Sequence, residues 1–458
     1  MRNFKVLGVL TLVLVLSVSL LAGCGNGSSN SNASPSGTAI DTGASNSDTG
    51  SADSQPKKKL RFFTKGNENN ADYRVMKSLI DQYQKEVNPN FEVEIESIPN
   101  DTQYFQKLRT YIAGNQLPDF FKIPNGLLSE NLAKQGRLVD IKATLQEFGM
   151  FDEFNKAAID FLSFSDGNLY LFPEGKYGEA FWYYKKPFEE NNIKVPTTFD
   201  EFVDAAAKLK AEGYTPIAVS GKEMWQLVRY LSFIPLRLTH TEFIDKLKTG
   251  DEKFTGEIGM KAANLLSTLG KGGYFQKGFS SMDYTQTLNF FLGGNAVIHY
   301  NGSWELAQFK DKYDSGEIGY FFIPEVAGAE NNGPNTSITA GLAYAFNKET
   351  FDAETKRFFK FVVEHYNQAA FDVGGYLSPM NGDLPSNVFK LAKDFSLDLE
   401  AVAKGGVSWD DKLDPASNEV VGSTANELAL GLITPEEFAE KVDKAIGRNA
   451  PSFFKDQK

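Results

Sequence analysis

The chain of 458 residues contains a single cysteine, Cys24, and this limits how the protein can be stabilised. One thiol gives no intramolecular disulfide and no site built from several thiolates, such as a structural zinc centre. Stability therefore has to come from a large buried core. The composition supplies one, because 41% of the residues are hydrophobic and 38 are phenylalanine. A chain of this length predicts two or three packed units.

The residues before Cys24 form an apolar run. Arg2 and Lys5 come first, and residues 6–22 carry no charge. A basic start, an apolar stretch and small residues before the cysteine are typical of a cleaved secretory signal peptide. The cysteine at the first mature position resembles the bacterial lipobox, in which the thiol is diacylated before cleavage. The alternative is an uncleaved membrane helix, for which the run is at the short limit.

We therefore expect residues 1–23 to be a lipoprotein signal peptide and residues 24–56 to be a lipidated Cys24 with a disordered tether. Residues 25–56 are almost wholly Gly, Ser, Asn, Ala, Thr and Asp, without an aromatic residue. Such a segment buries too little surface to fold. Random-coil scaling gives it a span of about 30 Å. The predicted location is the cell membrane, lipid-anchored, on the extracellular or periplasmic side.

The charge balance excludes some classes of binding partner. Without Arg2 and Lys5, 45 of the 47 basic residues remain against 59 acidic ones, a net charge of −14. An acidic surface repels nucleic acid and anionic headgroups, so neither is an expected partner. The histidines lie far apart, and an acidic cluster near residue 410 lacks the glycine and the final glutamate of a calcium loop. We predict no metal and no cofactor.

Folded sequence is predicted to begin at residue 57, with strands and helices in alternation. Strands are expected at 60–63, 91–96, 120–123, 216–219 and 296–298, and helices at 71–87, 104–113, 199–209 and 438–446. The alternation of the first five elements is typical of a parallel sheet with helical crossovers. The turn residues Asp166-Gly167-Asn168 separate the apolar runs 161–164 and 169–172, which predicts a β-hairpin.

Four sequence blocks, in this order, resemble a known family. The blocks are Pro118-Asp119-Phe120-Phe121 with Leu132 to Ile141, Gly167-Asn168-Leu169-Tyr170 with Trp182 to Phe188, Val195 to Phe202, and Phe290 to Trp304. They resemble the family 1 extracellular solute-binding proteins of ABC importers, which include maltose-binding protein. The chain departs from the family pattern at Lys185, where Asn is usual, and at Phe199, where Trp is usual.

The resemblance implies an α/β chain with the two-lobed type II periplasmic-binding-protein fold and a ligand cleft between the lobes. Lobe 1 is then roughly 57–178 plus 330–368, and lobe 2 is 179–329 plus 369–458. The resemblance also implies that the lobes close on a ligand and dock on the transmembrane subunits of an ABC permease. We predict a sugar or oligosaccharide as the ligand and a monomeric protein.

A sugar receptor needs aromatic rings for the C–H faces of the sugar and polar groups for its hydroxyls. Trp182, Trp225 and Trp304 fall at segment ends that the family places around the cleft, whereas Trp409 lies in a polar stretch. Trp304 is the main candidate, because it follows an apolar strand and the carboxyl ends of strands face the crevice in open α/β sheets. For each tryptophan the alternative is packing in a core.

The polar candidates follow predicted strands or lie where the family's chain crosses between lobes. Glu68 follows the first predicted strand, together with Lys65 and Asn67. Asp283 and Tyr284 precede a predicted helix, so each is either a helix cap or a contact in the wall of the cleft. The predicted ligand-binding set, without a catalytic residue, is Lys65, Asn67, Asn125, Glu179, Trp182, Trp225, Asp283, Trp304 and Tyr376.

Three other functions stay open. A glycoside hydrolase would use paired carboxylates and aromatic platforms, and the spatial separation of carboxylates is invisible in a sequence. The motifs of serine hydrolases, zinc proteases and phosphate-binding loops do not occur. An adhesion or structural lipoprotein would need repeats or an exposed apolar patch. A same-fold binder of a non-sugar solute is the third alternative.

Overall fold

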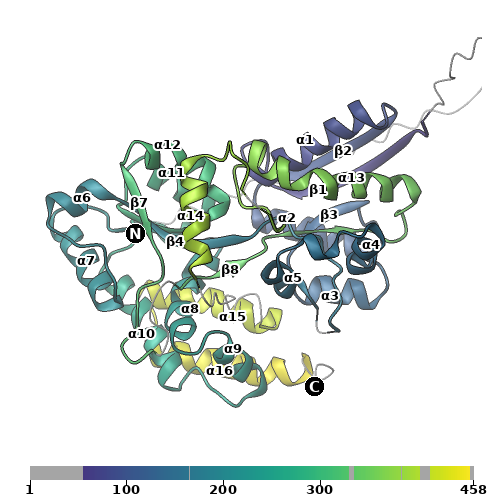
Figure 1. Ribbon diagram of the computed structural model, residues 1–458. Helices are drawn as coiled ribbons and strands as arrows, with labels where there is room; N and C mark the ends of the chain where they lie inside the picture. Colours follow the sequence, from purple (N-terminus) through teal and green to yellow (C-terminus); the bar gives the residue numbers. More distant parts are fainter. Residues whose placement is uncertain (1–54, 165, 330–334, 383, 403–412, 454–458) are drawn as a thin grey trace, which may run out of the picture. The chain divides into compact units, whose positions relative to one another are not determined.

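Two β-sheets organise the folded part of the chain, and helices cover both of them (Figure 1). The computed structural model describes residues 55–164, 166–329, 335–382, 384–402 and 413–453. Both sheets belong to one compact unit, Ser54–Lys458. The predicted signal peptide, Cys24, the tether up to residue 54 and Trp409 lie outside the described residues.

The first sheet has the strand order β2-β1-β3-β9. Its strands are β1 (Lys58–Lys65), β2 (Phe91–Ile98), β3 (Phe120–Ile123) and β9 (Ala343–Phe346). Strand β1 pairs in parallel with β2 and β3, and β9 runs antiparallel to β3. The helices α1 (Ala71–Glu86) and α2 (Asp101–Ala113) make the crossovers. The predicted strand–helix alternation is confirmed.

Phenylalanine rings hold the first sheet together from strand to strand. Phe62, Phe120 and Phe346 are register partners on β1, β3 and β9. Their rings stack with centroids 4.3 Å apart between Phe62 and Phe120 and 5.5 Å apart between Phe120 and Phe346. All three are buried, so each covers its neighbour's apolar face and excludes water. This stacking explains how a body without disulfides remains stable.

Further helices complete the first half. They are α3 (Leu127–Lys134), α4 (Ile141–Phe148), the short 3₁₀ turn η1 (Phe151–Glu153), α5 (Lys156–Leu162), α13 (Ala353–Ala369) and the π-helical turn η4 (Ala370–Gly374). The predicted hairpin is wrong in both arms, because 161–162 end α5 and 169–172 form no strand. Its turn does form, since the Phe164 N–H donates to the Asn168 carbonyl at 2.9 Å. The buried residues Ala158, Phe161 and Leu162 have helical spacing, which overrides the strand pattern.

The second sheet is built around a long central strand. It contains β5 (Ile217–Ala218), β6 (Ile298–Gly302), β4 (Tyr177–Tyr184) and β7 (Ile318–Phe321) in this order, with β8 (Ile338–Thr339) paired to the start of β4. Strand β4 is antiparallel to β6 and β7, and β5 is parallel to β6. The strand predicted at 296–298 begins at Ile298 and continues to Gly302, which brings its end next to Trp304.

Helices surround this second sheet. They are α6 (Lys185–Glu190), α7 (Phe199–Ala211), α8 (Trp225–Thr239), α9 (Glu242–Thr249), α10 (Glu257–Lys271), α11 (Tyr284–Leu292), α12 (Leu306–Asp314), α14 (Lys390–Glu400), α15 (Pro415–Ala429) and α16 (Pro435–Phe453), with the 3₁₀ turns η2 (Phe279–Ser281) and η3 (Ser303–Glu305). Thr198 caps α7 in a capping box with Glu201, as its sequence predicts. Helices α8, α10, α15 and α16 pack on one another (Figure 1).

The chain passes between the two halves at three places. Strand β4 begins in the core of the first half and ends in that of the second, and β8 runs antiparallel beside the start of β4. At the third place, Tyr376 belongs to the core of the first half and Leu377 to a core of the second. The Lys176 N–H donates to the Leu377 carbonyl at 3.0 Å, which joins the third crossing to the first. The sequence-predicted lobe boundaries stay predictions. We propose crossings near residues 178, 339 and 376.

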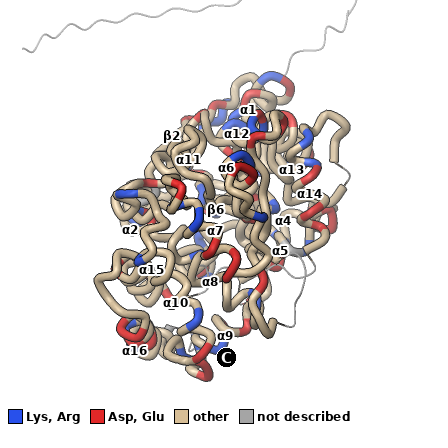
Figure 2. The backbone as a smooth tube through the Cα atoms, turned by 90° about the vertical axis from the view of Figure 1, so that its left-hand side faces the viewer, with Lys and Arg blue, Asp and Glu red and all other residues tan. Residues whose placement is uncertain are grey.

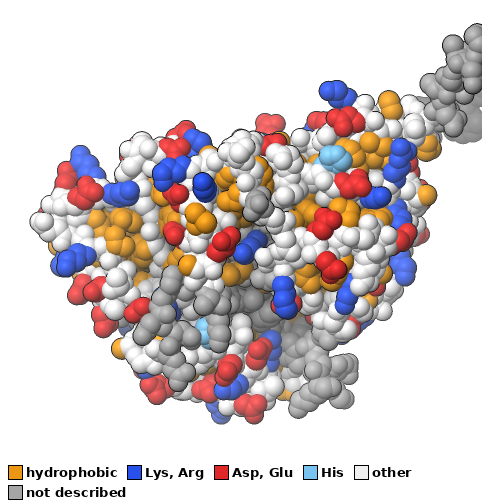
Figure 3. Space-filling view, viewed as in Figure 1, with side chains coloured by type: hydrophobic (Ala, Val, Ile, Leu, Met, Phe, Trp, Pro, Cys, Tyr) orange, Lys and Arg blue, Asp and Glu red, His pale blue; other side chains and the backbone are white. Residues whose placement is uncertain are grey.

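The surface carries both signs of charge. Lys and Arg alternate with Asp and Glu along the backbone drawn in Figure 2 and over the face drawn in Figure 3, with small apolar areas between them. Within the described ranges, every helix is too short or too polar to span a lipid bilayer.

Candidate ligand-binding site

Three partly exposed aromatic side chains meet beside the second sheet, and we call them the aromatic wall: Trp225, Tyr284 and Trp304. Trp225 opens α8, Tyr284 opens α11, and Trp304 lies in the turn after β6. The centroid of the Trp225 ring lies 5.8 Å from that of Tyr284 and 6.0 Å from that of Trp304. The structure thus brings together two of the predicted tryptophans and the tyrosine that follows Asp283.

A chain of hydrogen bonds fixes two rings of the aromatic wall, those of Trp304 and Tyr284. The Trp304 indole N–H donates to the Tyr284 hydroxyl at 2.8 Å, and this hydroxyl donates to Glu305 Oε1 at 2.6 Å. Gln308 donates to the other oxygen of the same carboxylate. Burial raises the pKa of Glu305 to about 7. Burial also raises the pKa of Tyr284, so its hydroxyl stays protonated and able to donate.

Trp304 also reaches the first half of the unit. Its ring packs on the first core and stands edge-on to Tyr177 at 5.8 Å between centroids. Gly302 allows this position, because a Cβ there would lie 2.1 Å from an atom of the indole. The backbone at Gly302 has an ordinary conformation, so the requirement for glycine comes from the close approach of the ring. The indole therefore lies against the backbone between the two halves.

A buried ionic cluster lies in the first half, and we call it the lysine cluster: Lys122, Asp72 and Glu174. Lys122 comes from β3, Asp72 from the first turn of α1, and Glu174 from the loop before β4. The Lys122 ammonium contacts Asp72 and lies 2.5 Å from Glu174 Oε2. Burial raises the pKa of Glu174 to about 7 although the charge of Lys122 opposes it.

Electrostatic coupling places the lysine cluster near the aromatic wall. Besides burial, the charge of Asp72 raises the pKa of Glu305 and the charge of Lys65 lowers it. The charge of Lys65 also lowers the pKa of Glu174. Lys65, at the end of β1, therefore lies within electrostatic reach of both carboxylates. Charges of the first half thus act on Glu305, the carboxyl group that binds the Tyr284 hydroxyl.

Two predicted aromatic contacts are core residues. Trp182 is fully buried, its ring stacks with Phe395 at 5.6 Å, and its indole N–H donates to the Asn301 carbonyl at 3.0 Å. It belongs to the central strand β4, which is covered on both faces, so the core alternative applies. Tyr376 is also buried, and its hydroxyl lies 2.9 Å from that of Tyr366.

Glu179 offers no free carboxylate at the crossing. It is fully buried, and the Arg229 Nε donates to its two oxygens at 3.0 and 2.9 Å. The guanidinium carbon of Arg229 lies 5.3 Å from the centroid of the Trp225 ring. The sequence reasoning missed Arg229 and Glu305. Both could have been found from their positions in the sequence, because Arg229 lies four residues after Trp225 and Glu305 directly follows Trp304.

The remaining polar candidates make hydrogen bonds within the chain. Asn67 Oδ1 accepts from the Asn69 N–H at 2.9 Å, as in a turn. Asp283 caps α11 by accepting from the Gln286 N–H at 2.9 Å. Asn125 makes a long-range bond, because it donates to the carbonyl of Phe161, 36 residues further on. These contacts do not bring the three side chains together.

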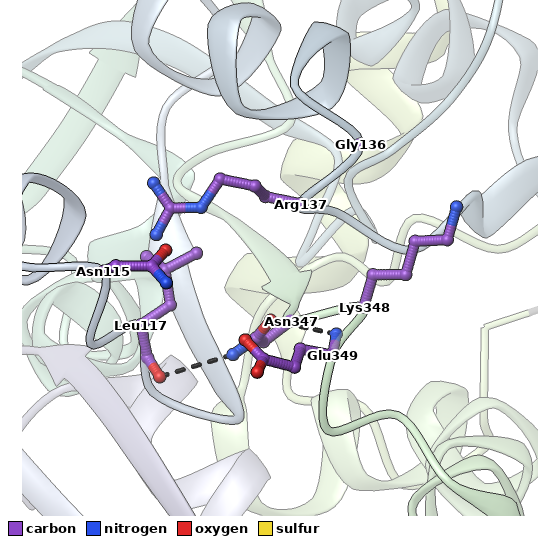
Figure 4. A pocket seen from close by; sticks show the side chains of 7 residues that line it. All are labelled: Asn115, Leu117, Gly136, Arg137, Asn347, Lys348 and Glu349. Carbon is purple, nitrogen blue, oxygen red and sulfur yellow. Dashed lines mark hydrogen bonds between the residues drawn. The ribbon is translucent and has the colours of Figure 1, made fainter.

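A separate cavity of about 230 Å³ lies in the first half and shares no residue with the aromatic wall (Figure 4). Its lining is Asn115, Leu117, Gly136, Arg137, Asn347, Lys348 and Glu349. The Asn347 amide donates to the Leu117 carbonyl at 3.4 Å and accepts from the Glu349 N–H at 3.1 Å. Its polar side chain is therefore already satisfied by the chain. We assign no ligand to this cavity.

The histidines and acids of the described ranges form no group of three or more suited to a metal ion. Asp414, from the acidic cluster near residue 410, caps α15, and the rest of that cluster lies outside the described residues.

Comparison with known proteins identifies the family. The family of bacterial extracellular solute-binding proteins matches residues 67–369, about two thirds of the chain. The chain belongs to this family. It is 25% identical over 416 residues to the multiple sugar-binding protein of Streptococcus mutans, which covers 86% of this chain and 94% of the relative.

Solved structures show the same fold. A chitin oligosaccharide binding protein matches with a TM-score of 0.76 and 23% identity over 86% of this chain and 98% of its own. A structure from work on xylan utilization by Caldanaerobius polysaccharolyticus has a TM-score of 0.76 and 24% identity over 84% and 99%. RafE in complex with raffinose has a TM-score of 0.68 and 21% identity over 85% and 99%. The predicted α/β, two-lobed fold is confirmed.

Proposed function

We propose that this chain captures a sugar or oligosaccharide outside the cell and delivers it to an ABC transporter permease, without catalysing a reaction. The observation that carries the proposal is the aromatic wall, whose rings are partly exposed and two of which are fixed by hydrogen bonds. The C–H face of a sugar stacks on such rings, and its hydroxyls bind partly exposed polar side chains. The similarity to a multiple sugar-binding protein, a chitin oligosaccharide binding protein and RafE in complex with raffinose supports a sugar over other solutes.

The proposed site divides its residues by role. Trp225, Tyr284 and Trp304 would provide stacking faces, and Asp72 and Lys65 would bind hydroxyl groups. Asn67, Asn125 and Asp283 stay untested as ligand contacts. Burial argues against direct contact for Glu179, Trp182 and Tyr376.

The anchor and the partners belong to the proposal as well. Cys24, lipidated after cleavage of residues 1–23, would hold a monomer at the outer face of the membrane, with residues 25–56 as tether. Because cleavage follows diacylation of the thiol, the wild type should incorporate a labelled fatty acid and lose residues 1–23, and Cys24→Ser should do neither. A wild-type chain that takes up no label and keeps residues 1–23 would instead favour an uncleaved helix.

A calorimetric titration tests the ligand class. The wild-type chain is titrated with raffinose, stachyose, xylo-oligosaccharides and chitin oligosaccharides. We expect at least one to bind near micromolar affinity, about −8 kcal/mol. Amino acids, divalent metals and polyamines form the control panel. Tight binding of a control compound without any carbohydrate response would overturn the sugar assignment. Release of new reducing ends from a bound sugar would favour the glycoside hydrolase alternative.

A further inference from the structure

We infer that Arg229 is a positioning residue, which holds Trp225 in the aromatic wall through an ion pair with Glu179 at the chain crossing. The inference concerns the internal geometry of the wall. It rests on the proposed function only where ligand affinity is the readout.

The geometry starts from helical spacing. Trp225 and Arg229 are four residues apart on α8, so their side chains lie on the same face of the helix. The guanidinium carbon lies 5.3 Å from the centroid of the indole ring, within the range of a cation–π contact. Arg229 is 6% exposed, so water does not weaken this contact strongly. One face of the Trp225 ring therefore rests on a buried cation.

The other side of the guanidinium is bound to the crossing. Arg229 Nε lies 2.9 Å and 3.0 Å from the two oxygens of Glu179, which is fully buried on β4. The backbone of Glu179 is itself held, because its N–H donates to the Ser337 carbonyl at 3.2 Å and its carbonyl accepts from Thr336. Glu179 is thus bound to the segment that leads into β8. A continuous set of contacts therefore joins this crossing to Arg229 and to the indole.

Arginine suits this role better than lysine. A planar guanidinium stacks on an indole and at the same time donates to a carboxylate, whereas an ammonium is a compact charge that cannot stack. Glu179 and Arg229 also depend on each other, because removal of one leaves the other as a buried, unpaired charge. We therefore expect the ion pair to fix both the position of Trp225 and the local folding.

The first test reads the position of Trp225 without a ligand. Iodide quenching of tryptophan fluorescence is measured on the full chain, and the contribution of Trp225 is the difference from the same protein carrying Trp225→Phe. We expect Arg229→Lys to raise the quenching constant of Trp225 at least twofold. An unchanged constant overturns the inference. This readout remains valid when none of the sugars binds, so it separates the inference from the proposed function.

The second test reads affinity for raffinose, stachyose, xylo-oligosaccharides and chitin oligosaccharides. Arg229→Gln should weaken binding of whichever of these sugars the wild type binds by at least tenfold, with partial rescue in Arg229→Lys. Because Arg229→Gln leaves a buried charge and risks misfolding, the double variant Glu179→Gln with Arg229→Met removes both charges at similar volume. It should fold and still bind at least fivefold more weakly. Wild-type affinity in this folded double variant overturns the inference.

Arg237 provides a matched control on the same helix. It is also buried, and its Nε donates to the carbonyls of Ile323 and Pro324 at 3.1 and 3.0 Å. It lies twelve residues after Trp225, about 18 Å along the helix axis. Arg237→Gln should lower the melting temperature but change sugar affinity and Trp225 quenching less than twofold. Equal effects of the Arg229 and Arg237 variants on affinity would reduce Arg229 to a structural residue and overturn the inference.

Discussion

The two halves of the unit contribute different chemistry to the region where they meet. The first half presents the lysine cluster, in which one buried cation is shared by two carboxylates. The second half presents the aromatic wall, in which the Trp304 and Tyr284 rings are fixed by hydrogen bonds that end on Glu305. Both contain a carboxyl group whose pKa burial raises to about 7.

This difference shows how the two halves can contribute in different ways to a proposed sugar site. Ion pairs fix polar groups at the cost of desolvating charges, and they lose their value when one partner is removed. Rings fixed by hydrogen bonds keep an apolar face available to a ligand. We therefore expect substitutions in the lysine cluster to act mainly on stability and substitutions in the aromatic wall mainly on affinity.

Lys122→Met should have the largest effect. It leaves the buried Glu174 and the partly exposed Asp72 without their cation, so the free energy of unfolding at pH 8 should fall by about 3–5 kcal/mol. Urea unfolding followed by circular dichroism measures this. Glu174→Gln is the control, because it keeps the shape and one ion pair and should cost less. A loss below about 1 kcal/mol in Lys122→Met would show that the two carboxylates do not need the charge of Lys122 for stability.

Trp304→Ala should weaken sugar binding by about 1–3 kcal/mol, the value of a lost stacking face. Isothermal titration measures it with the best ligand of the sugar panel. Trp182→Phe serves as the control, since this buried residue should lower the melting temperature and leave the affinity unchanged. If Trp304→Ala lowers thermal stability without changing affinity, Trp304 is a core residue.

Glu305→Gln should change stability in a pH-dependent manner. Burial raises the pKa of Glu305 from 4.5 to about 7, so between these values the folded protein holds a proton that the unfolded chain has released. The contribution of this group to stability therefore falls as pH rises from 4.5 to 7, and its cost is complete above pH 7. The variant should gain up to ~3 kcal/mol over wild type at pH 8 and nothing below pH 4.5. A difference independent of pH in urea unfolding would contradict this origin.

Asp283→Ala should have the smallest effect. Loss of its cap on α11 should cost about 1 kcal/mol of stability, and Asp283→Asn should retain most of it. Sugar affinity should stay within twofold of wild type in both variants, as measured by titration. A tenfold loss of affinity would restore Asp283 to the ligand-binding set predicted from the sequence.

Sequence reasoning found the features that depend on local pattern. Strands were predicted at 60–63 and 120–123 from short runs rich in Leu, Phe and Ile; all four residues of β3 are buried, and in the run 60–63 only Arg61 is exposed. Trp225 and Trp304 were predicted because each follows a strand. The lysine cluster was missed, because Lys122 and Asp72 are ordinary charged residues, 50 positions apart, until the sheet brings them together.

The ion pair of Glu179 and Arg229 was missed for the same reason. In the sequence, Glu179 was a carboxylate available to a ligand, since nothing local revealed its partner 50 residues away. Trp182 shows a different limit of the sequence. Its place in an alternating strand pattern fitted a ligand contact and a core residue equally well, and only the helices packed over β4 show that it is buried.

The close approach at Gly302 has a consequence for how the receptor can vary. The space of a single methyl group at this position is already filled by the six-membered ring of Trp304. A variant such as Gly302→Ala would displace the indole while leaving every aromatic residue in the sequence intact. Solute binding by this chain should therefore depend on a glycine that has no side chain of its own to contact the solute.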